Sequence, residues 1–170
     1  MIMIFGVVLA GGIGSRMGNV DKPKQYLLVG EKPIIIHTLE RFYVQNEFEK
    51  IIVLCPEEWV SHTKNLIKKY MKDTERIVVL QGGDTRNETI MNSLRYIEKE
   101  YGLDDDTIVV THDSVRPFVT QRIIEENIKY AQEYGACDTV VPATDTIVPS
   151  PNLSCLTFLP IVASAAVIIE

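Results

Sequence analysis

The sequence predicts an α/β protein with a doubly wound, mostly parallel sheet and helices on both faces of that sheet. Short runs rich in β-branched residues alternate with longer amphipathic stretches along most of the chain, and this alternation is typical of βαβ units. Each run is almost continuously apolar, as expected of strands covered on both sides. Glycines, hydroxyl groups and charged residues follow several of the runs, where such a sheet binds its ligands.

The elements can be placed in order along the chain. Strands are expected at residues 4–9, 50–54, 77–81, 107–112 and 136–141. Helices are expected at residues 34–45, 57–70, 86–100 and 120–134. The second and third helices each show an apolar stripe, which in the third is formed by Ile90, Leu94, Ile97 and Tyr101. Thr120 is expected to cap the start of the fourth helix, and Gly102 and Gly135 follow the third and fourth helices as C-terminal caps do.

The chain of 170 residues suits a single domain, which we place at residues 1–148. The remaining residues, 149–170, contain three of the eight prolines and a single charged residue, Glu170. Pro160 interrupts their apolar run, which is therefore shorter than the roughly 20 residues that a membrane-spanning helix needs. We predict no structure for this tail and no association with a membrane.

Composition excludes several classes of protein. The formal net charge of −6 argues against a nucleic-acid-binding protein, which usually carries a basic face. The three cysteines have no metal-ligand spacing, and they are interpreted as reduced thiols of a cytoplasmic protein. Residues 1–9 lack the basic start of a signal peptide and are interpreted as a strand.

The segment after the first strand carries the strongest functional signal. Residues 9–18 read Leu-Ala-Gly-Gly-Ile-Gly-Ser-Arg-Met-Gly, and Lys22 and Lys24 flank Pro23 just beyond them. Glycines allow backbone N–H groups to approach an anion closely. Between residues 11 and 32 the four basic side chains outnumber the two acidic ones. This local excess of positive charge in an acidic chain predicts a phosphate-binding site.

Two common phosphate-binding motifs do not fit this loop. The dinucleotide fingerprint G-x-G-x-x-G requires a small residue where Met17 stands, and an acidic residue about 20 positions further on. The first candidate acid after the second strand, Glu57, is about twice as far away. The loop also lacks the Gly-Lys-Ser/Thr sequence of a P-loop.

Together with the Pro-Lys-Gln of residues 23–25, the loop resembles the signature of the nucleotide-sugar and cytidylyltransferase superfamily. Residues 82–86 read Gly-Gly-Asp-Thr-Arg and residues 112–117 read His-Asp-Ser-Val-Arg-Pro. These two motifs are similar to those of the methylerythritol phosphate and ribitol-5-phosphate cytidylyltransferases. Residues 87–92 and 111–118 look closer to the ribitol-phosphate enzymes. The resemblance covers residues 3–148 and implies a nucleotide-diphospho-sugar transferase-like fold.

The resemblance implies that the protein transfers CMP from CTP to a polyol phosphate, with ribitol 5-phosphate favoured over methylerythritol phosphate. It implies Arg16 and Lys24 as catalytic residues that stabilise the transition state. Asp113 is expected to bind Mg²⁺ or another divalent cation, because Mg²⁺ at phosphates prefers carboxylate ligands. Arg116 and Thr146 are expected on the acceptor side. The expected nucleotide-binding residues are Leu9, Ala10, Gly11, Gly12, Gly14, Gly83, Asp84, Arg86, Thr89 and Ser114.

Two of these loops have distinct expected roles. Backbone amides of residues 10–14 would bind the triphosphate, while Gly83 and the Thr89 hydroxyl would read the cytosine. Asp84 and Arg86 would orient the second loop. Arg86 alternatively begins a helix and pairs with an acid, and Asp113 alternatively anchors its loop.

In members of the family, the chain beyond the position that corresponds to residue 148 contains a dimerisation arm, basic residues that hold the acceptor and a second acidic metal ligand. Residues 149–170 contain no lysine, arginine or aspartate. Two hypotheses therefore stand side by side: a cytidylyltransferase, and a shortened nucleotide-binding module of the same family with impaired catalysis. The homodimer that is usual for the family is not expected from this tail.

Overall fold

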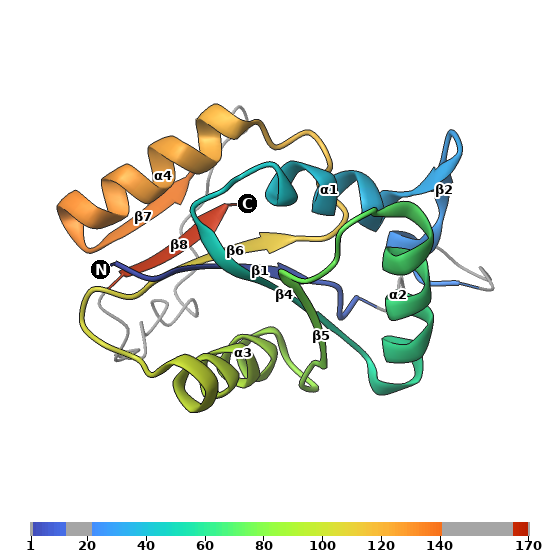
Figure 1. The fold of residues 1–170 in the computed structure, drawn as a ribbon, viewed down its shortest axis with the longest axis horizontal. Helices are drawn as coiled ribbons and strands as arrows, with labels where there is room; N and C mark the ends of the chain where they lie inside the picture. Colours follow the sequence, from blue (N-terminus) through green and yellow to red (C-terminus); the bar gives the residue numbers. More distant parts are fainter. Residues whose placement is uncertain (1, 13–21, 141–164, 170) are drawn as a thin grey trace, which may run out of the picture.

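The computed structural model describes residues 2–12, 22–140 and 165–169. Its centre is a parallel sheet of six strands in the order β5–β4–β1–β6–β8–β7, seen edge-on in Figure 1. The strands are β1 (Ile4–Leu9), β4 (Phe48–Cys55), β5 (Ile77–Gln81), β6 (Ile108–Asp113), β7 (Ala136–Thr139) and β8 (Ala165–Ile169). The predicted α/β class and parallel sheet are confirmed.

Helices cover both faces of the sheet, as predicted. They are α1 (Ile34–Tyr43), α2 (Glu57–Tyr70), α3 (Arg86–Tyr101) and α4 (Gln121–Tyr134). Figure 1 shows α1 and α4 on the opposite side of the sheet from α3. A single turn, η2 (Lys24–Tyr26), and a small antiparallel hairpin of β2 (Leu28–Val29) and β3 (Lys32–Pro33) precede α1. No helix in the described ranges is both long and apolar enough to cross a bilayer.

Strand β1 lies at the centre because its side chains are apolar on both faces. Phe5, Val7 and Leu9 pack in one core cluster with α3, whereas Ile4 and Val8 pack in the other with α1, α2 and α4. All six residues of β1 are buried. This division explains the continuous apolar run in the sequence, because each strand contributes to two cores at once.

The helix ends follow the expected capping chemistry. The Thr120 hydroxyl accepts a hydrogen bond from the Ile123 amide, and Gly135 ends α4 in the left-handed conformation. Helix α3 begins with a capping box, in which Thr85 and Glu88 bond each other's backbone amides. The box fixes the start of α3 directly after the loop of residues 82–84.

Besides differences of one or two residues at the ends of other elements, among them β4 and β6, one helix and one strand differ from the prediction. Helix α1 ends at Tyr43 rather than at residue 45, and β8 occupies residues of the tail for which we predicted no structure. β8 pairs with β6 on one side and with β7 on the other. Residues 165–169 therefore belong to the main sheet, while the rest of the tail lies outside the described residues.

Arg76 explains the early end of α1. Its guanidinium donates to the carbonyl oxygens of Tyr43 at 2.6 Å and Gln45 at 2.9 Å, and it lies 4.5 Å from the centre of the Tyr43 ring. Carbonyl groups at the end of a helix lack partners within the helix. Arg76 provides these partners from the loop before β5, and so joins α1 to the edge of the sheet.

The bonds of Arg76 to the end of α1 are expected to contribute measurably to the stability of the fold. Replacing Arg76 with alanine is expected to lower the free energy of unfolding by about 1.5–3 kcal/mol, because charge-assisted hydrogen bonds at a half-buried helix end are lost. Urea unfolding followed by circular dichroism measures the change. Lys50→Ala, which removes a single exposed bond to the Glu75 carbonyl, should change stability by less than about 0.5 kcal/mol. Equal effects of the two substitutions would contradict this role of Arg76.

Candidate functional site

The candidate site lies where the direction of chain winding changes. From β1 the chain adds β4 and β5 on one side and then returns to add β6 on the other. Leu9 at the end of β1 is in register with Leu54 of β4 and Asp113 of β6. Such switch points open a crevice at the carboxyl ends of the strands. Here the crevice is a cavity of about 410 Å³.

Most of the predicted site residues that the structure describes line this cavity. It is lined by Leu9, Gly11, Gly12, Lys24, Gly83, Asp84, Arg86, Thr89, Asp113 and Ser114, together with Gln25, Thr85 and Val115. Ala10 is not part of the lining; it is buried, and it stands between Leu9 and Gly11 in the chain. Gly14, Arg16 and Thr146 lie outside the described residues. Loops that are far apart in sequence thus converge on one cavity, and the roles assigned to their residues stay predictions.

Gly11 and Gly12, where the chain leaves β1, have space around them within the described part of the chain. Among the described residues, a Cβ atom on Gly12 would meet no atom within 4 Å, and one on Gly11 would meet only the Thr89 hydroxyl, at 4.0 Å. Behind the glycines, the Ala10 amide donates to the Leu54 carbonyl at 2.8 Å. The Ser114 amide donates to the carbonyl of Leu9 at 2.9 Å. The glycines therefore extend from a backbone held by both neighbouring strands.

The loop before α3 is shaped by its own hydrogen bonds. The Gly83 amide donates to the Thr89 hydroxyl at 3.0 Å, and that hydroxyl lies 2.9 Å from the Thr85 carbonyl, to which it donates. The Asp84 and Thr85 amides both donate to the Glu88 carboxylate. Gly83 and Thr89 were expected to read a cytosine directly. In this structure the Gly83 amide and the Thr89 hydroxyl satisfy each other, so they also hold the loop in shape.

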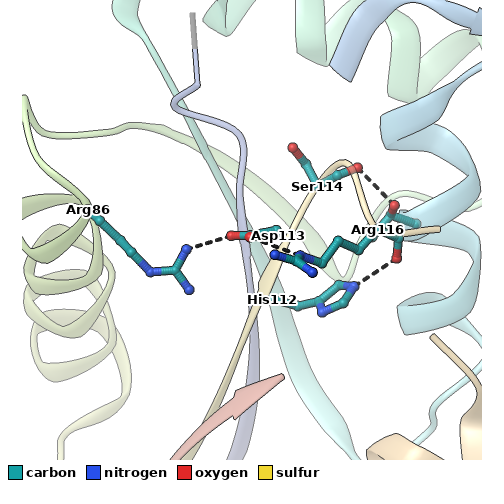
Figure 2. A network of polar contacts seen from close by, with 6 residues as sticks. Arg86, His112, Asp113, Ser114 and Arg116 are labelled. Atoms are coloured by element: carbon teal, nitrogen blue, oxygen red, sulfur yellow. Dashed lines mark hydrogen bonds and ion pairs between the residues drawn. The ribbon is translucent and has the colours of Figure 1, made fainter. Parts of the chain in front are cut away.

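Asp113 joins two arginines from different elements. Its Oδ1 accepts from Nη1 of Arg86 at 2.6 Å, and its Oδ2 accepts from Nε of Arg116 at 3.2 Å. Figure 2 shows the carboxylate between these two side chains. Arg86 begins α3, so both alternative interpretations, a helix start and a pair with an acid, are found together. The ion pairs link the second loop to the end of β6.

Buried contacts fix the turn that carries Asp113. Nε2 of His112 lies 2.9 Å from the Arg116 carbonyl oxygen, and the His112 ring stacks on Phe42. The Thr38 hydroxyl donates to the Ser114 carbonyl at 2.9 Å. The turn after β6 is therefore held against α1 by contacts with Thr38 and Phe42. Arg116 itself lines a second cavity of about 400 Å³, which shares Val115 with the first.

The donor set can be compared with the expected cation. In phosphoryl-transfer sites Mg²⁺ binds one or two carboxylates and completes its shell with substrate phosphates and water. Asp113 and Asp84 both line the cavity, and each carboxylate oxygen of Asp113 keeps acceptor capacity beyond its arginine bond. These residues fit Mg²⁺ that is held jointly with a nucleotide. Among the described residues, no three His, Cys, Asp or Glu side chains are grouped to hold a metal by themselves.

Three residues of the cavity were not among the predicted site residues. Thr85 could have been found from the sequence, because Thr85-Arg-Asn-Glu88 matches the capping-box pattern S/T-x-x-E. Gln25 could have been suspected from its place directly after Lys24. Val115 lies inside the segment 112–117, but its apolar side chain carries no chemical group that would mark it as a site residue.

The chain matches one family model and is similar to several solved structures. The family model described as 2-C-methyl-D-erythritol 4-phosphate cytidylyltransferase (IspD) matches residues 4–157. The structure is similar to a solved 2-C-methyl-D-erythritol 4-phosphate cytidylyltransferase from Francisella tularensis, with a TM-score of 0.66 and 28% identity over 88% of this chain and 62% of that one.

Two further solved structures support the fold. One is 4-diphosphocytidyl-2C-methyl-D-erythritol synthase from Anaerococcus prevotii, with a TM-score of 0.66 and 24% identity over 86% of this chain and 58% of that chain. The other is the bifunctional IspDF from Campylobacter jejuni, with a TM-score of 0.63 and 21% identity over 86% of this chain and 35% of that one. The chain spans less than two thirds of the length of each of these three proteins.

Proposed function

The chain belongs to the 2-C-methyl-D-erythritol 4-phosphate cytidylyltransferase (IspD) family, and from this premise we propose that it transfers CMP from CTP to a polyol phosphate. The observation that carries the proposal is the cavity at the switch point. It brings the glycines of the first loop, Lys24 and the loop before α3 against the end of β6. These are the same segments whose motifs resemble the cytidylyltransferases.

The proposed reaction needs positioning and charge stabilisation more than covalent chemistry. A phosphate oxygen of the acceptor bonds to the α-phosphorus of CTP, while the bond from that phosphorus to the β-phosphate oxygen breaks. Pyrophosphate leaves, and the new phosphoanhydride bond joins the CMP phosphate to the acceptor phosphate, so that a diphosphate links cytidine to the polyol. Negative charge builds on the α-phosphoryl oxygens and on the leaving group, so preorganised cations lower the barrier.

The residues have distinct proposed roles in this reaction. Backbone amides at Gly11 and Gly12 bind the triphosphate, and Lys24 neutralises the developing charge as a point charge. Arg16 is proposed to share that role. Asp113, with Asp84 nearby, would hold Mg²⁺, which when bound withdraws charge from the phosphates.

We propose 2-C-methyl-D-erythritol 4-phosphate as the first acceptor to test, because the matching family and the similar Francisella tularensis structure carry its name. Ribitol 5-phosphate is the second acceptor. The segments 87–92 and 111–118 favour it by resemblance alone. On either acceptor, Arg116 and Thr146 are proposed to contact the acceptor side.

Pyrophosphate release tests the proposal. Purified protein is incubated with CTP and Mg²⁺ alone, with methylerythritol phosphate, and with ribitol 5-phosphate. Release that requires one acceptor, and that fails when UTP or ATP replaces CTP, is the expected result. Omission of Mg²⁺ is expected to abolish release. Release without any acceptor would indicate simple hydrolysis and would contradict the transfer reaction.

A binding measurement separates the two hypotheses that the sequence leaves open. Calorimetric titration with CTP is expected to show binding in the wild-type protein. Binding without release on either acceptor would favour the nucleotide-binding module. Absence of CTP binding would overturn both hypotheses.

A further inference from the structure

Gln25 is a buried polar side chain directly beside Lys24. Its exposed fraction is only 1%, although glutamine is mostly exposed in proteins. Nε2 of Gln25 donates to the backbone carbonyl of Ala10 at 2.6 Å. Such a short buried hydrogen bond between residues 15 positions apart indicates that it fixes the turn at Gln25 to the end of β1.

The acceptor of this bond is itself fixed in the sheet. The Ala10 amide donates to the Leu54 carbonyl at 2.8 Å, and Ala10 is the last buried residue before Gly11 and Gly12. Gln25 therefore bonds the backbone at the point where the chain leaves β1 for the glycines. Both ends of the segment between Ala10 and Gln25 are joined by this one side chain.

Lys24 and Gln25 share the short turn η2. The Tyr26 amide donates to the Pro23 carbonyl at 2.9 Å, and the Leu27 amide donates to the Lys24 carbonyl at 3.1 Å. These local bonds make the turn compact, so displacement of Gln25 moves Lys24 with it. On its other side, Tyr26 bonds the Thr63 hydroxyl at 2.8 Å and stacks on Trp59. Burial raises the pKa of Tyr26 far above its usual range, which keeps its hydroxyl protonated.

We propose that Gln25 is a positioning residue that holds Lys24 at the nucleotide cavity by bonding the Ala10 carbonyl. This inference rests on the proposed function, because it assigns to Lys24 a contact with the triphosphate. Lysine carries a flexible stem that loses considerable rotamer freedom on ordering. Fixing its backbone against the glycine loop reduces the range that its ammonium group must search. Of the two buried side chains after Lys24, only Gln25 reaches the cavity wall; Tyr26 points toward α2.

A double-mutant cycle in CTP affinity tests the proposal. Gln25→Met keeps the length of the side chain but removes its amide donor. Alone, it is expected to weaken CTP binding about tenfold, and Lys24→Ala alone is expected to weaken it at least as much. In the Lys24→Ala background, Gln25→Met is expected to add less than about a twofold loss, because the group that it positions is gone.

A matched control separates positioning from general loosening. Thr63→Val also removes hydrogen bonds of a buried side chain, those of its hydroxyl with Tyr26 and with the Trp59 carbonyl, but on the α2 side of Tyr26, away from Ala10. It is expected to lower the melting temperature while changing CTP affinity less than about twofold. If Gln25→Met does not fold, Gln25→Asn replaces it, since the shorter amide keeps its polarity but does not reach the Ala10 carbonyl.

Each outcome has a separate meaning. An equal loss from Gln25→Met with and without Lys24 would overturn the positioning role, and so would no loss at all in the wild-type background. A coupled loss that Thr63→Val reproduces would overturn it as well. CTP binding that is unaffected by Lys24→Ala would instead contradict the proposed nucleotide contact of Lys24, and thus the function on which this inference rests.

Discussion

Replacing Lys24 with alanine is expected to lower kcat/KM for CTP by about 10²–10³, the usual consequence of removing one preorganised group that stabilises charge in the transition state. Lys24 lines the cavity beside Gly11 and Gly12. In a cavity whose walls also carry two carboxylates, Asp84 and Asp113, a bound triphosphate needs positive charge close to its phosphates. Initial rates of pyrophosphate release at varied CTP concentrations measure the effect.

Lys22 provides the matched control, because it lies two residues earlier and carries the same charge. Lys22 is exposed and is not part of the cavity lining. Burial, and to a lesser degree the charge of Lys22, lower the pKa of His62, which places Lys22 near α2. Lys22→Ala should therefore change kcat/KM less than about threefold, as screened surface charges do. A loss of equal size in both variants would indicate a general charge effect and would contradict a specific role for Lys24.

The strands and helices were predictable because their signals are local. The apolar run of β1 and the helical stripe of Ile90, Leu94 and Ile97 can be read within a few residues of sequence. Ile77–Gln81 and Glu57–Tyr70 have the bounds that the sequence predicts. In these segments local preference and tertiary packing agree.

The missed features depend on contacts between distant residues. Arg76 ends α1 from a position more than 30 residues away, and no pattern near Tyr43 announces that bond. β8 inserts between β6 and β7, although an isolated apolar run does not reveal which strands it will pair with. Gln25 stands in the Pro-Lys-Gln segment of the sequence, but its bond to the Ala10 carbonyl is visible only in the structure. Sequence therefore located the segments of the candidate site, whereas the structure was needed to find what holds them together.

Gly83→Ala is expected to damage both the fold and the site. A Cβ atom at this position would overlap the Glu88 side chain at its Cβ and would lie 2.9 Å from the Glu88 carbonyl carbon and 3.1 Å from the Thr89 amide nitrogen. Two of these three atoms belong to the backbone of α3, which cannot rotate away as a side chain can. We expect a loss of about 1–3 kcal/mol in the free energy of unfolding, as is usual for overpacking.

The same substitution should weaken CTP binding at least about tenfold, because relief of the clash must move the loop that carries the Gly83–Thr89 bond and begins α3. Gly12→Ala separates the two effects. Its Cβ would meet no atom of the described residues within 4 Å, so the free energy of unfolding should be unchanged or higher by up to about 1 kcal/mol, even if its methyl group obstructs the nucleotide. Urea unfolding and CTP titration of both variants are the measurements. Wild-type stability and affinity in Gly83→Ala would mean that the loop tolerates a side chain, and the close packing of Gly83 on α3 would then not be what shapes the cavity.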